Sequence, residues 1–427
     1  MFTRRHPIGW NHAMAGVALR LADIWRRVGA VGVVLAVGGA VVVDSLHAQS
    51  RAVPVQVATI ELRIGDQNGE KYEFENILAN VFPTASGGVL VPQEKEADVR
   101  EFDTQGKYVR TIGRRGAGPG EFQGISTLGR WDDTVWVTDG KARRITVMAP
   151  GARTVTIPIE AVPTSTKPVG ITRARVLLFD GLVATSDFRR DVRAAPTVLV
   201  DAHNHTTLLT RTFAHATTSI MVFSGAGVTS TSITMVNRSF SQDGLVALSN
   251  DGQWLVMIDR RVAPGANAGV LPVDVYDAHG VKKNSFTVQR TPVAAELKFF
   301  DVTINKTSER LASMHKGIFP STAAARKEVE KQLNLPATYP LAGGLVVENE
   351  NSIWIAEPYG AKPVLNLSTL GTDPGIVWER FDMKGVLRQR VRIPVAVKLQ
   401  AVQDGAFWGT ALDADEVQYV VRLKVKP

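Results

Sequence analysis

Basic side chains cluster at three places in the first half of the chain, and clustered cations can bind anions. Such clusters attract carboxylates, phosphate groups and acidic glycans. The alternative is that they are solvated surface charge, with Arg143 and Arg144 simply opening a strand. The predicted anion-binding residues are Arg114, Arg115, Lys141, Arg143, Arg189 and Arg190.

Two acidic residues end apolar stretches at matching positions. Asp139 follows TVWVT and Glu357 follows SIWIA. Carboxylate oxygens are ligands for hard cations, so this pair could hold Ca²⁺ or Zn²⁺ near the centre of the fold. The alternative is that Asp139 anchors its own turn through the amides of residues 140–142. We favour the turn, so the sequence predicts no metal and no cofactor, with Ca²⁺ or Zn²⁺ as the alternative.

The remaining motifs give little support for catalysis, and no catalytic residue is predicted. The chain has no cysteine, which excludes disulfides and thiolate chemistry. His203 and His205 occupy a turn without an obvious carboxylate as third ligand, so we interpret them as exposed turn residues. GRRGAGPGEF (113–122) lacks the Lys-Ser/Thr pair of a phosphate-binding loop. Its glycines are expected to let a crossover run close to a sheet.

The N-terminus has the pattern of a secretory signal. Residues 1–27 hold five arginines against one acid, and residues 28–43 are sixteen uncharged, mostly apolar residues. Sixteen is fewer than the about 20 residues that a stable membrane span needs. The sequence therefore predicts a signal peptide at 1–48 that is cleaved after Ala48, which gives a periplasmic or extracellular protein. Only this segment, if uncleaved, would contact the membrane.

The charge of the remaining chain is modest. Residues 1–48 contain five basic and two acidic groups, so their removal lowers the net charge from +8 to +5. A nucleic-acid binder usually carries a denser positive charge. Export and this modest charge both argue against nucleic acid as a partner.

Short apolar strands recur along the rest of the chain after acidic, Asn or Gly turns. The first series is expected at 87–93, 132–139, 180–187, 243–250, 351–358 and 404–411. We interpret these as the second strands of repeated units, with Trp136, Trp354 and Trp408 as core between units. A second series in phase with the first lies at 99–103, 145–149, 197–201, 273–277, 377–382 and 419–423. A β-rich unit that recurs about every fifty residues is typical of propeller blades.

After most strands of the second series, a tight turn leads into a further alternating strand. Each unit therefore has four antiparallel strands. The sequence thus predicts an all-β, six-bladed β-propeller over 49–427. No fourth strand follows 419–423 in the sixth unit, whereas VATIELRIG (57–65) has no unit of its own. We expect 57–65 to pair with 419–426, because this pairing closes the ring and hides two strand edges.

These repeats, together with GRRGAGPGEF, resemble the NHL-repeat and related TolB-like six-bladed propellers. The closest resemblance is to exported bacterial six-bladed propellers of unassigned function, in which a G-x-x-G-x-G-P-G-E-F linker joins the first two blades. The resemblance covers about residues 57–427, and DGAFWG (404–409) is another specific part of it. The third and fourth blades match the family pattern less well. Some NHL-repeat propellers bind RNA or proteins and a few are metal-dependent enzymes. The resemblance therefore implies the fold and leaves the activity open.

Long insertions are expected on the face that carries the crossovers between blades. The crossover between the fourth and fifth blades (about 289–341) contains PSTAAARKEVEKQLNLP, predicted to be one helix that packs over the rim or forms a lid. The adjacent loop 357–375 adds Tyr359 as a candidate ligand contact. The sequence predicts an exported, non-catalytic propeller that binds an envelope protein, an anionic glycan or a small molecule on this face. The alternative is a divalent-cation-dependent hydrolase or lyase of the lactonase-like type, with Asp139 and Glu357 as metal ligands.

Overall fold

The structure, a computed structural model, is all-β apart from two α-helices and one short 3₁₀ helix, η1 (Gly265–Asn267), among the described residues. All of these elements lie in one compact unit, Val55–Pro427. The predicted signal peptide at 1–48 lies outside the described residues. Within the described part, no helix is long and apolar enough to cross a membrane. The structure describes residues 53–426 except 67, 75–76, 78–79, 160–165, 182–194, 214–217, 224–231, 238–243, 264, 296–300, 333–336, 359–366, 368–369 and 371–372.

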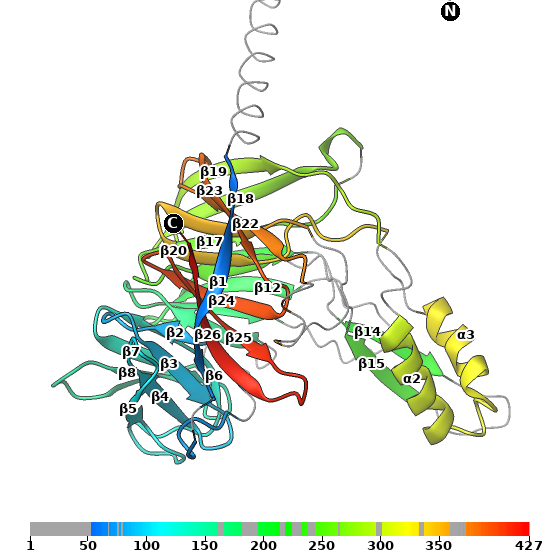
Figure 1. Cartoon of the computed structure of the whole chain (residues 1–427), viewed down its shortest axis with the longest axis horizontal. Helices are drawn as coiled ribbons and strands as arrows, with labels where there is room; N and C mark the ends of the chain where they lie inside the picture. Colours follow the sequence, from blue (N-terminus) through cyan, green and yellow to red (C-terminus); the bar gives the residue numbers. More distant parts are fainter. Residues whose placement is uncertain are drawn as a thin grey trace, which may run out of the picture. The chain divides into compact units, whose positions relative to one another are not determined.

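Four of the sheets are four-stranded and antiparallel, each built from strands that are consecutive in sequence (Figure 1). The first contains β2 (Phe82–Pro83), β3 (Val89–Gln93), β4 (Asp98–Phe102) and β5 (Tyr108–Ile112). The second contains β6 (Ile125–Trp131), β7 (Thr134–Asp139), β8 (Arg144–Met148) and β9 (Val155–Pro158). The third contains β10 (Thr166–Ile171), β11 (Val176–Gly181), β12 (Ala195–Asp201) and β13 (Thr207–Phe213). The fourth contains β16 (Leu245–Leu248), β17 (Trp254–Ile258), β18 (Val270–Asp277) and β19 (Lys282–Gln289).

An eight-stranded sheet contains two further groups of four strands, joined through β1 (Val55–Ile64). The first group is β20 (Leu345–Asn349), β21 (Ser352–Ala356), β22 (Ile376–Phe381) and β23 (Leu387–Ile393). The second is β24 (Val397–Gln403), β25 (Ala406–Leu412), β26 (Gln418–Val425) and β1 itself.

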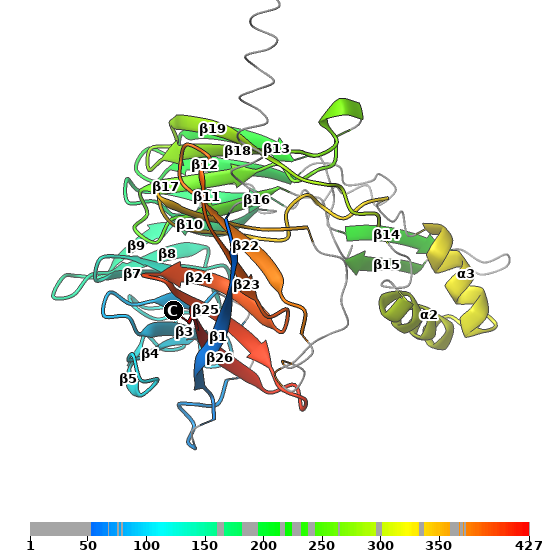
Figure 2. The same ribbon diagram turned by 45° about the horizontal axis from the view of Figure 1, so that its top comes forward.

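The two ends of the described chain pair with each other, as the sequence predicts. β1 runs antiparallel to β26, from Ala58 opposite Val425 to Ile64 opposite Val420. Figure 2 shows β1 in blue beside β26 in dark red. The first residues of β1, 55–57, pair in parallel with β23, a contact that the sequence did not indicate.

The turns between third and fourth strands have the chemistry expected from their sequences. In the first sheet, Asp103 Oδ1 accepts hydrogen bonds from the amides of Gln105 (2.9 Å) and Lys107 (2.8 Å). Gly106 between them has φ of 77°, a conformation that favours glycine. The side-chain cap and the left-handed residue together reverse the chain.

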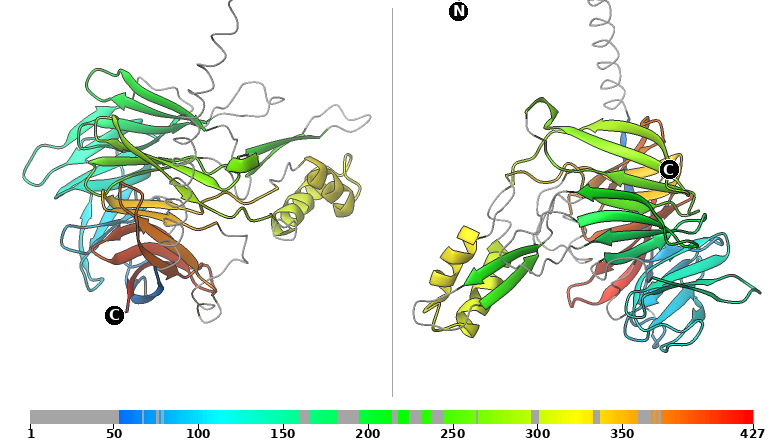
Figure 3. Two further views of the ribbon diagram at one scale, coloured as in Figure 1. Left: turned by 90° about the horizontal axis from the view of Figure 1, so that it is seen from above. Right: turned by 180° about the vertical axis from the view of Figure 1, so that it is seen from behind.

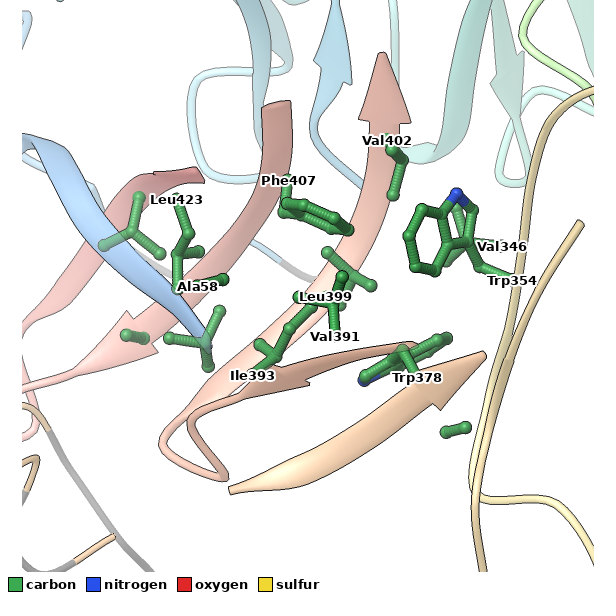
Figure 4. Close-up of a cluster of buried hydrophobic side chains, with 14 of the residues drawn as sticks. Ala58, Val346, Trp354, Trp378, Val391, Ile393, Leu399, Val402, Phe407 and Leu423 are labelled. Carbon is green, nitrogen blue, oxygen red and sulfur yellow. The ribbon is translucent and has the colours of Figure 1, made fainter. Parts of the chain in front are cut away.

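Apolar side chains hold each sheet against the next. The cluster in Figure 4 joins β20–β23 to β24–β26, and within it Trp354 meets Phe407 edge-on with ring centroids 5.0 Å apart. Similar clusters join the other sheets that are consecutive in sequence. Another, containing Trp408 and Phe102, joins the β24–β26 group back to the first sheet. This arrangement is consistent with a β-propeller.

Two insertions interrupt the series of sheets. β14 (Thr218–Phe223) and β15 (Ser232–Asn237) form an antiparallel hairpin between β13 and β16. The helices α2 (Asp301–Met314) and α3 (Thr322–Gln332) follow β19 and are yellow in Figure 3. They share a small apolar core that includes Ile304, Leu311 and Val329. α3 lies within the segment predicted to be helical, whereas α2 was not predicted, so the expectation of one inserted helix was incomplete.

Two of the predicted second strands are wrong. In the third sheet the second strand is β11, at Val176–Gly181 rather than at 180–187. In the fourth sheet, 243–250 contains the first strand β16, and the second strand is β17. A short apolar run looks the same in a first and in a second strand, because both are covered on two faces by neighbouring sheets.

Candidate ligand-binding cavity

A cavity of about 320 Å³ lies among the first strands of the sheets. It is lined by Phe82 on β2, 126–128 on β6, Val169 on β10, 247–248 on β16, 345–347 on β20, and Lys398 and Gln400 on β24. Residues that are far apart in sequence thus face one space. Small-molecule sites are typically concave spaces of about 300–1,000 Å³. This cavity, which we call the axial cavity, is therefore the candidate functional site.

The lining of the axial cavity combines apolar walls with hydroxyl and amide groups. Lys398 is the one ionisable side chain among the described residues that line it. It is exposed, and no ion pair or hydrogen bond joins its ammonium group to another described side chain. The uncharged polar residues of the lining are Asn80, Ser126, Thr127, Ser249, Asn250 and Gln400.

Trp136 on β7 contributes to the lining, and its indole N–H is buried. The residue is only 5% exposed, and its Nε1 has no hydrogen-bond partner in the described part of the chain. Two glycines make room for the ring: a Cβ on Gly129 would lie 2.3 Å from Trp136 Cζ2, and one on Gly170 would lie 3.0 Å from Cη2. A buried donor without an acceptor costs about 1–3 kcal/mol.

Other polar groups of the lining bond neighbouring first strands to each other. The Asn80 side-chain amide donates to the Leu128 carbonyl (2.9 Å), and its oxygen accepts from the Leu128 N–H (3.2 Å). Thr127 Oγ1 donates to the Val169 carbonyl (2.8 Å). These side chains therefore hold the wall together, in contrast to the lysine and the indole described above.

Hydrogen bonds also tie together the strand ends at the turns between first and second strands. Arg130 Nε donates to the Pro83 carbonyl (2.6 Å), and its Nη2 donates to Gln403 Oε1 (2.7 Å). Asn250 Nδ2 donates to the Val402 carbonyl (2.7 Å). Burial lowers the pKa of the Arg130 guanidinium from its ordinary value. These contacts connect β2, β6, β24 and the segment after β16.

Around the linker 113–122, the predicted anion-binding cations contact other protein groups. Arg114 forms an ion pair with Glu121 (2.8 Å), and Arg144 Nη2 donates to the Glu121 carbonyl (2.6 Å). Arg115 donates to main-chain carbonyls of the turn between β3 and β4. Hydrogen bonds from the Gly118 amide and from Arg114 lower the pKa of the Glu121 carboxyl. The linker is thus fixed by contacts of its own Arg114 and Glu121 and of Arg144 on β8, which the sequence did not indicate.

The other predicted anion-binding residues differ in their surroundings. Arg143 has φ of 48° in the turn after β7, and its guanidinium donates to the Ile159 carbonyl (2.9 Å). Lys141 is exposed and lies over Gly124, where an added Cβ would be 2.8 Å from Lys141 Cδ. Outside the described residues lie Arg189, Arg190 and Tyr359. Anion binding by these six cations and Tyr359 stays a prediction.

The two candidate metal ligands are engaged by other protein groups. Asp139 is fully buried, and its carboxylate accepts hydrogen bonds from the amides of Ala142 (3.0 Å) and of residues 123 (2.7 Å) and 124 (3.1 Å). Glu357 forms an ion pair with Arg390 (2.7 Å). Among the described residues, no group of three or more His, Cys, Asp or Glu side chains could hold a metal. The predicted role of Asp139 in its own turn is confirmed, and this carboxylate also fixes the incoming crossover.

His203 and His205 lie in the turn between β12 and β13 and are exposed, which confirms their interpretation as turn residues. Asp201 Oδ1 caps this turn by accepting a hydrogen bond from the His203 amide (2.7 Å). His205 has φ of 57°. Asp201 and His205 therefore perform the local task that Asp and Gly perform in the other turns, and His203 supplies an amide that is capped.

Sequence reasoning identified neither Lys398 nor Trp136 as part of a site. Trp136 was correctly predicted to be core, and the pattern gave no information about its nitrogen. A weak signal existed at VKLQ, where Lys398 and Gln400 alternate with Val397 and Leu399. In a strand, such alternation places the polar set on one face of the sheet.

No family model matches the chain, and no curated protein matches it. Several solved structures follow a similar course. One is a member of the DUF4221 family from Bacteroides vulgatus ATCC 8482, with 10% identity, 88% of this chain and 98% of that chain covered, and a TM-score of 0.42. Regucalcin, a calcium-binding protein from Agrobacterium tumefaciens strain C58, has 13% identity, 87% and 98% coverage, and a TM-score of 0.39. Virginiamycin B lyase from Staphylococcus aureus has 11% identity, 86% and 100% coverage, and a TM-score of 0.37. Because the TM-scores are below 0.5, these similarities carry no argument about the function of this chain.

Proposed function

We propose that the chain is an exported, six-bladed β-propeller that binds a small molecule in its axial cavity and catalyses no reaction. Six blades are supported by the four four-stranded sheets and the two halves of the eight-stranded sheet. Apolar clusters join each of these to the next and the last to the first. In this ring β1 is the outer strand of the sixth blade.

The composition of the cavity wall is the observation that carries the binding function. All six first strands contribute to it, and they supply apolar, hydroxyl and amide groups around one lysine. Such a wall can orient and desolvate a ligand. General acid–base or metal-assisted chemistry would draw on convergent carboxylates or imidazoles. The two acids considered for that role, Asp139 and Glu357, are bonded to main-chain amides and to Arg390.

The basic N-terminal region and the apolar stretch that follows it support export. We propose cleavage after Ala48 and a periplasmic or extracellular location. The ligand is then a molecule of the envelope or the medium. The alternative is that an envelope protein or an anionic glycan binds the loops instead, through Arg114, Lys141 and Arg189.

Native mass spectrometry of the exported protein tests the proposal. The wild type is compared with Ser126→Phe, which places a ring in the cavity from an exposed lining position, and with Gln105→Phe in the exposed turn after β4 as a matched control. We expect a small molecule to co-purify with the wild type and the control, and to be lost from Ser126→Phe. Elemental analysis tests the alternative function, a divalent-cation-dependent hydrolase or lyase. Stoichiometric Ca²⁺ or Zn²⁺, with a turnover that chelation abolishes, would contradict a binding function.

A further inference from the structure

The surface that the axial cavity leaves for a ligand identifies the class of ligand, and this inference rests on the proposed binding function. We propose that the cavity takes an uncharged, mainly apolar molecule of about ten non-hydrogen atoms, of the kind represented by a medium-chain alcohol. The hydrogen bonds of the wall, its charge, its apolar side chains and the cavity volume each support this class.

Most polar side chains of the wall are already hydrogen-bonded to the protein. Gln400 Oε1 accepts a hydrogen bond from the Val81 amide (2.9 Å), and Ser249 Oγ accepts one from the Trp254 amide (2.9 Å). Five of the six uncharged polar side chains in the described lining form such bonds: Asn80, Thr127, Ser249, Asn250 and Gln400. A ligand rich in polar groups would therefore lose hydrogen bonds to water and regain few of them in the cavity.

The wall offers a ligand little charge. The described lining contains no Asp, Glu, Arg or His, and its one ionisable side chain, Lys398, is exposed. The carbon stem of a lysine can lie along an apolar surface while its ammonium group stays in water. A charged ligand would give up its hydration without a counter-charge held in the wall, which is costly. An uncharged ligand avoids this cost.

Apolar side chains supply the surface that remains for a ligand. Val169 on β10, Leu248 on β16 and Leu345 on β20 line the cavity and are only partly buried. They pack against the apolar clusters between sheets and still retain exposed surface, unlike the buried Trp136 nitrogen. Because the cavity lies among the first strands, the surface that neighbouring sheets leave uncovered on these side chains borders it. Covering that surface with an apolar ligand favours binding.

The size follows from the volume of the cavity. About 320 Å³ corresponds to about ten water molecules at about 30 Å³ each. A ligand of about ten non-hydrogen atoms fills such a space. A straight-chain alcohol such as octanol has this size, carries no charge and has a single polar group.

Calorimetric titration of the exported protein with straight-chain alcohols tests the inference. We expect the affinity to rise about fourfold with each methylene from butanol to octanol, which is the effect of burying one methylene group. The rise should stop at about decanol, where the chain becomes longer than the cavity can hold. Octanoate and octylammonium have chains of the same length and opposite charges, and each should bind at least about tenfold more weakly than octanol.

Variants locate this selectivity in the cavity wall. Val169→Thr exchanges a methyl group for a hydroxyl group of similar size and should weaken octanol binding about threefold. Val109→Thr makes the same exchange at an exposed position of β5 and should leave the binding unchanged. Thermal unfolding of each variant shows whether a loss of binding reflects a loss of folding. Should Val169→Thr fail to fold, Ala247→Ser makes a smaller polar change in the wall and should act in the same direction.

Each other outcome overturns the ligand class. Tighter binding of octanoate or octylammonium than of octanol would show that the cavity recognises a charge, and the proposed binding function would stand. An affinity independent of chain length would show that apolar surface does not drive the binding. Octanol binding that survives both Val169→Thr and Ser126→Phe unchanged would place it outside the cavity. If no alcohol binds, the ligand class is wrong, and co-purification and metal analysis still decide the proposed function separately.

Discussion

The linker region 113–122 and the axial cavity differ in whether their charged groups have protein partners. At the linker, Arg114 pairs with Glu121, and Arg144 donates to carbonyls of the linker. At the cavity, Lys398 has no such partner among the described residues. The linker is conspicuous in the sequence because its cations are clustered, whereas the cavity draws on six separate strands. The comparison indicates that a dense cluster of charge can hold a crossover in place, whereas the candidate site is assembled from scattered side chains of separate strands.

The largest expected effect tests the linker side of this comparison. Asp139→Ala removes a buried carboxylate that accepts three main-chain hydrogen bonds. We expect a loss of about 3–5 kcal/mol in the free energy of unfolding, because the three amides lose their acceptor in a buried place. Urea denaturation measures it.

The control for Asp139→Ala is Asp415→Ala, at an exposed turn position, which should change stability by less than about 0.5 kcal/mol. A metal-ligand role for Asp139 predicts something different. Chelation would then destabilise the wild type and leave the variant unaffected. That result would support a role of Asp139 as a metal ligand.

The second prediction concerns the cavity wall. Gly129→Ala would place a Cβ 2.3 Å from the ring of Trp136. We expect a loss of about 1–3 kcal/mol in the free energy of unfolding, since the ring must shift in a closely packed wall. Denaturation with tryptophan fluorescence measures both the loss and the displacement.

A double-mutant cycle identifies the cause of the Gly129→Ala effect. Trp136→Phe removes the ring atoms that would collide, so Gly129→Ala should cost less in that background by about 0.5 kcal/mol or more. Additive effects would mean that Gly129 is required for another reason. The indole would then be less firmly positioned against the cavity than we infer.

The sequence predicted the fold better than the site, for a physical reason. Alternation of apolar and polar residues is a local signal, and so are Asp and Gly in turns, as at Asp103 and Gly106. The pairing of β1 with β26 was predictable because both strands had an unmatched edge. The distinction between β16 and β17 was not, since a short apolar run looks the same in a first and in a second strand.

The candidate site depends on which side chains six separate strands bring together, and a sequence does not contain that information. Arg114 and Lys398 both carry a positive charge, but folding supplies Glu121 to the first and no described partner to the second. The cavity is formed by residues from 80 to 400. Its composition could only be examined once the strands were in place.

The third prediction uses a paired carboxylate elsewhere in the sheets. Burial opposes the ionisation of Asp274, but hydrogen bonds from Lys282, Ser285 and Arg211 outweigh this and lower its pKa below the ordinary 3.8. A carboxyl group with a lowered folded-state pKa stabilises the protein above the unfolded value. That contribution is lost as the pH falls through the folded-state pKa. We expect Asp274→Asn to cost about 1–2 kcal/mol at neutral pH and progressively less below about pH 4.

Urea denaturation between pH 3 and pH 7 measures this pH dependence. Asp415→Asn serves as the control and should show a constant, small difference from the wild type. A pH-independent cost of Asp274→Asn would mean that the side chain stabilises the sheets by packing rather than by its charge. Charge pairing would then be a weaker feature of the protein than the linker suggests.

The smallest expected effect sets the two regions side by side. Lys398→Gln should change the free energy of unfolding by less than about 0.5 kcal/mol, because the lysine is exposed and folding supplies no described partner for it. Arg144→Gln also removes one positive charge, but it breaks hydrogen bonds to the carbonyls of residues 117 and 121, and it should cost about 1–2 kcal/mol. Parallel denaturation of the two variants measures the difference. Equal costs would mean that Lys398 is a structural cation, like Arg144.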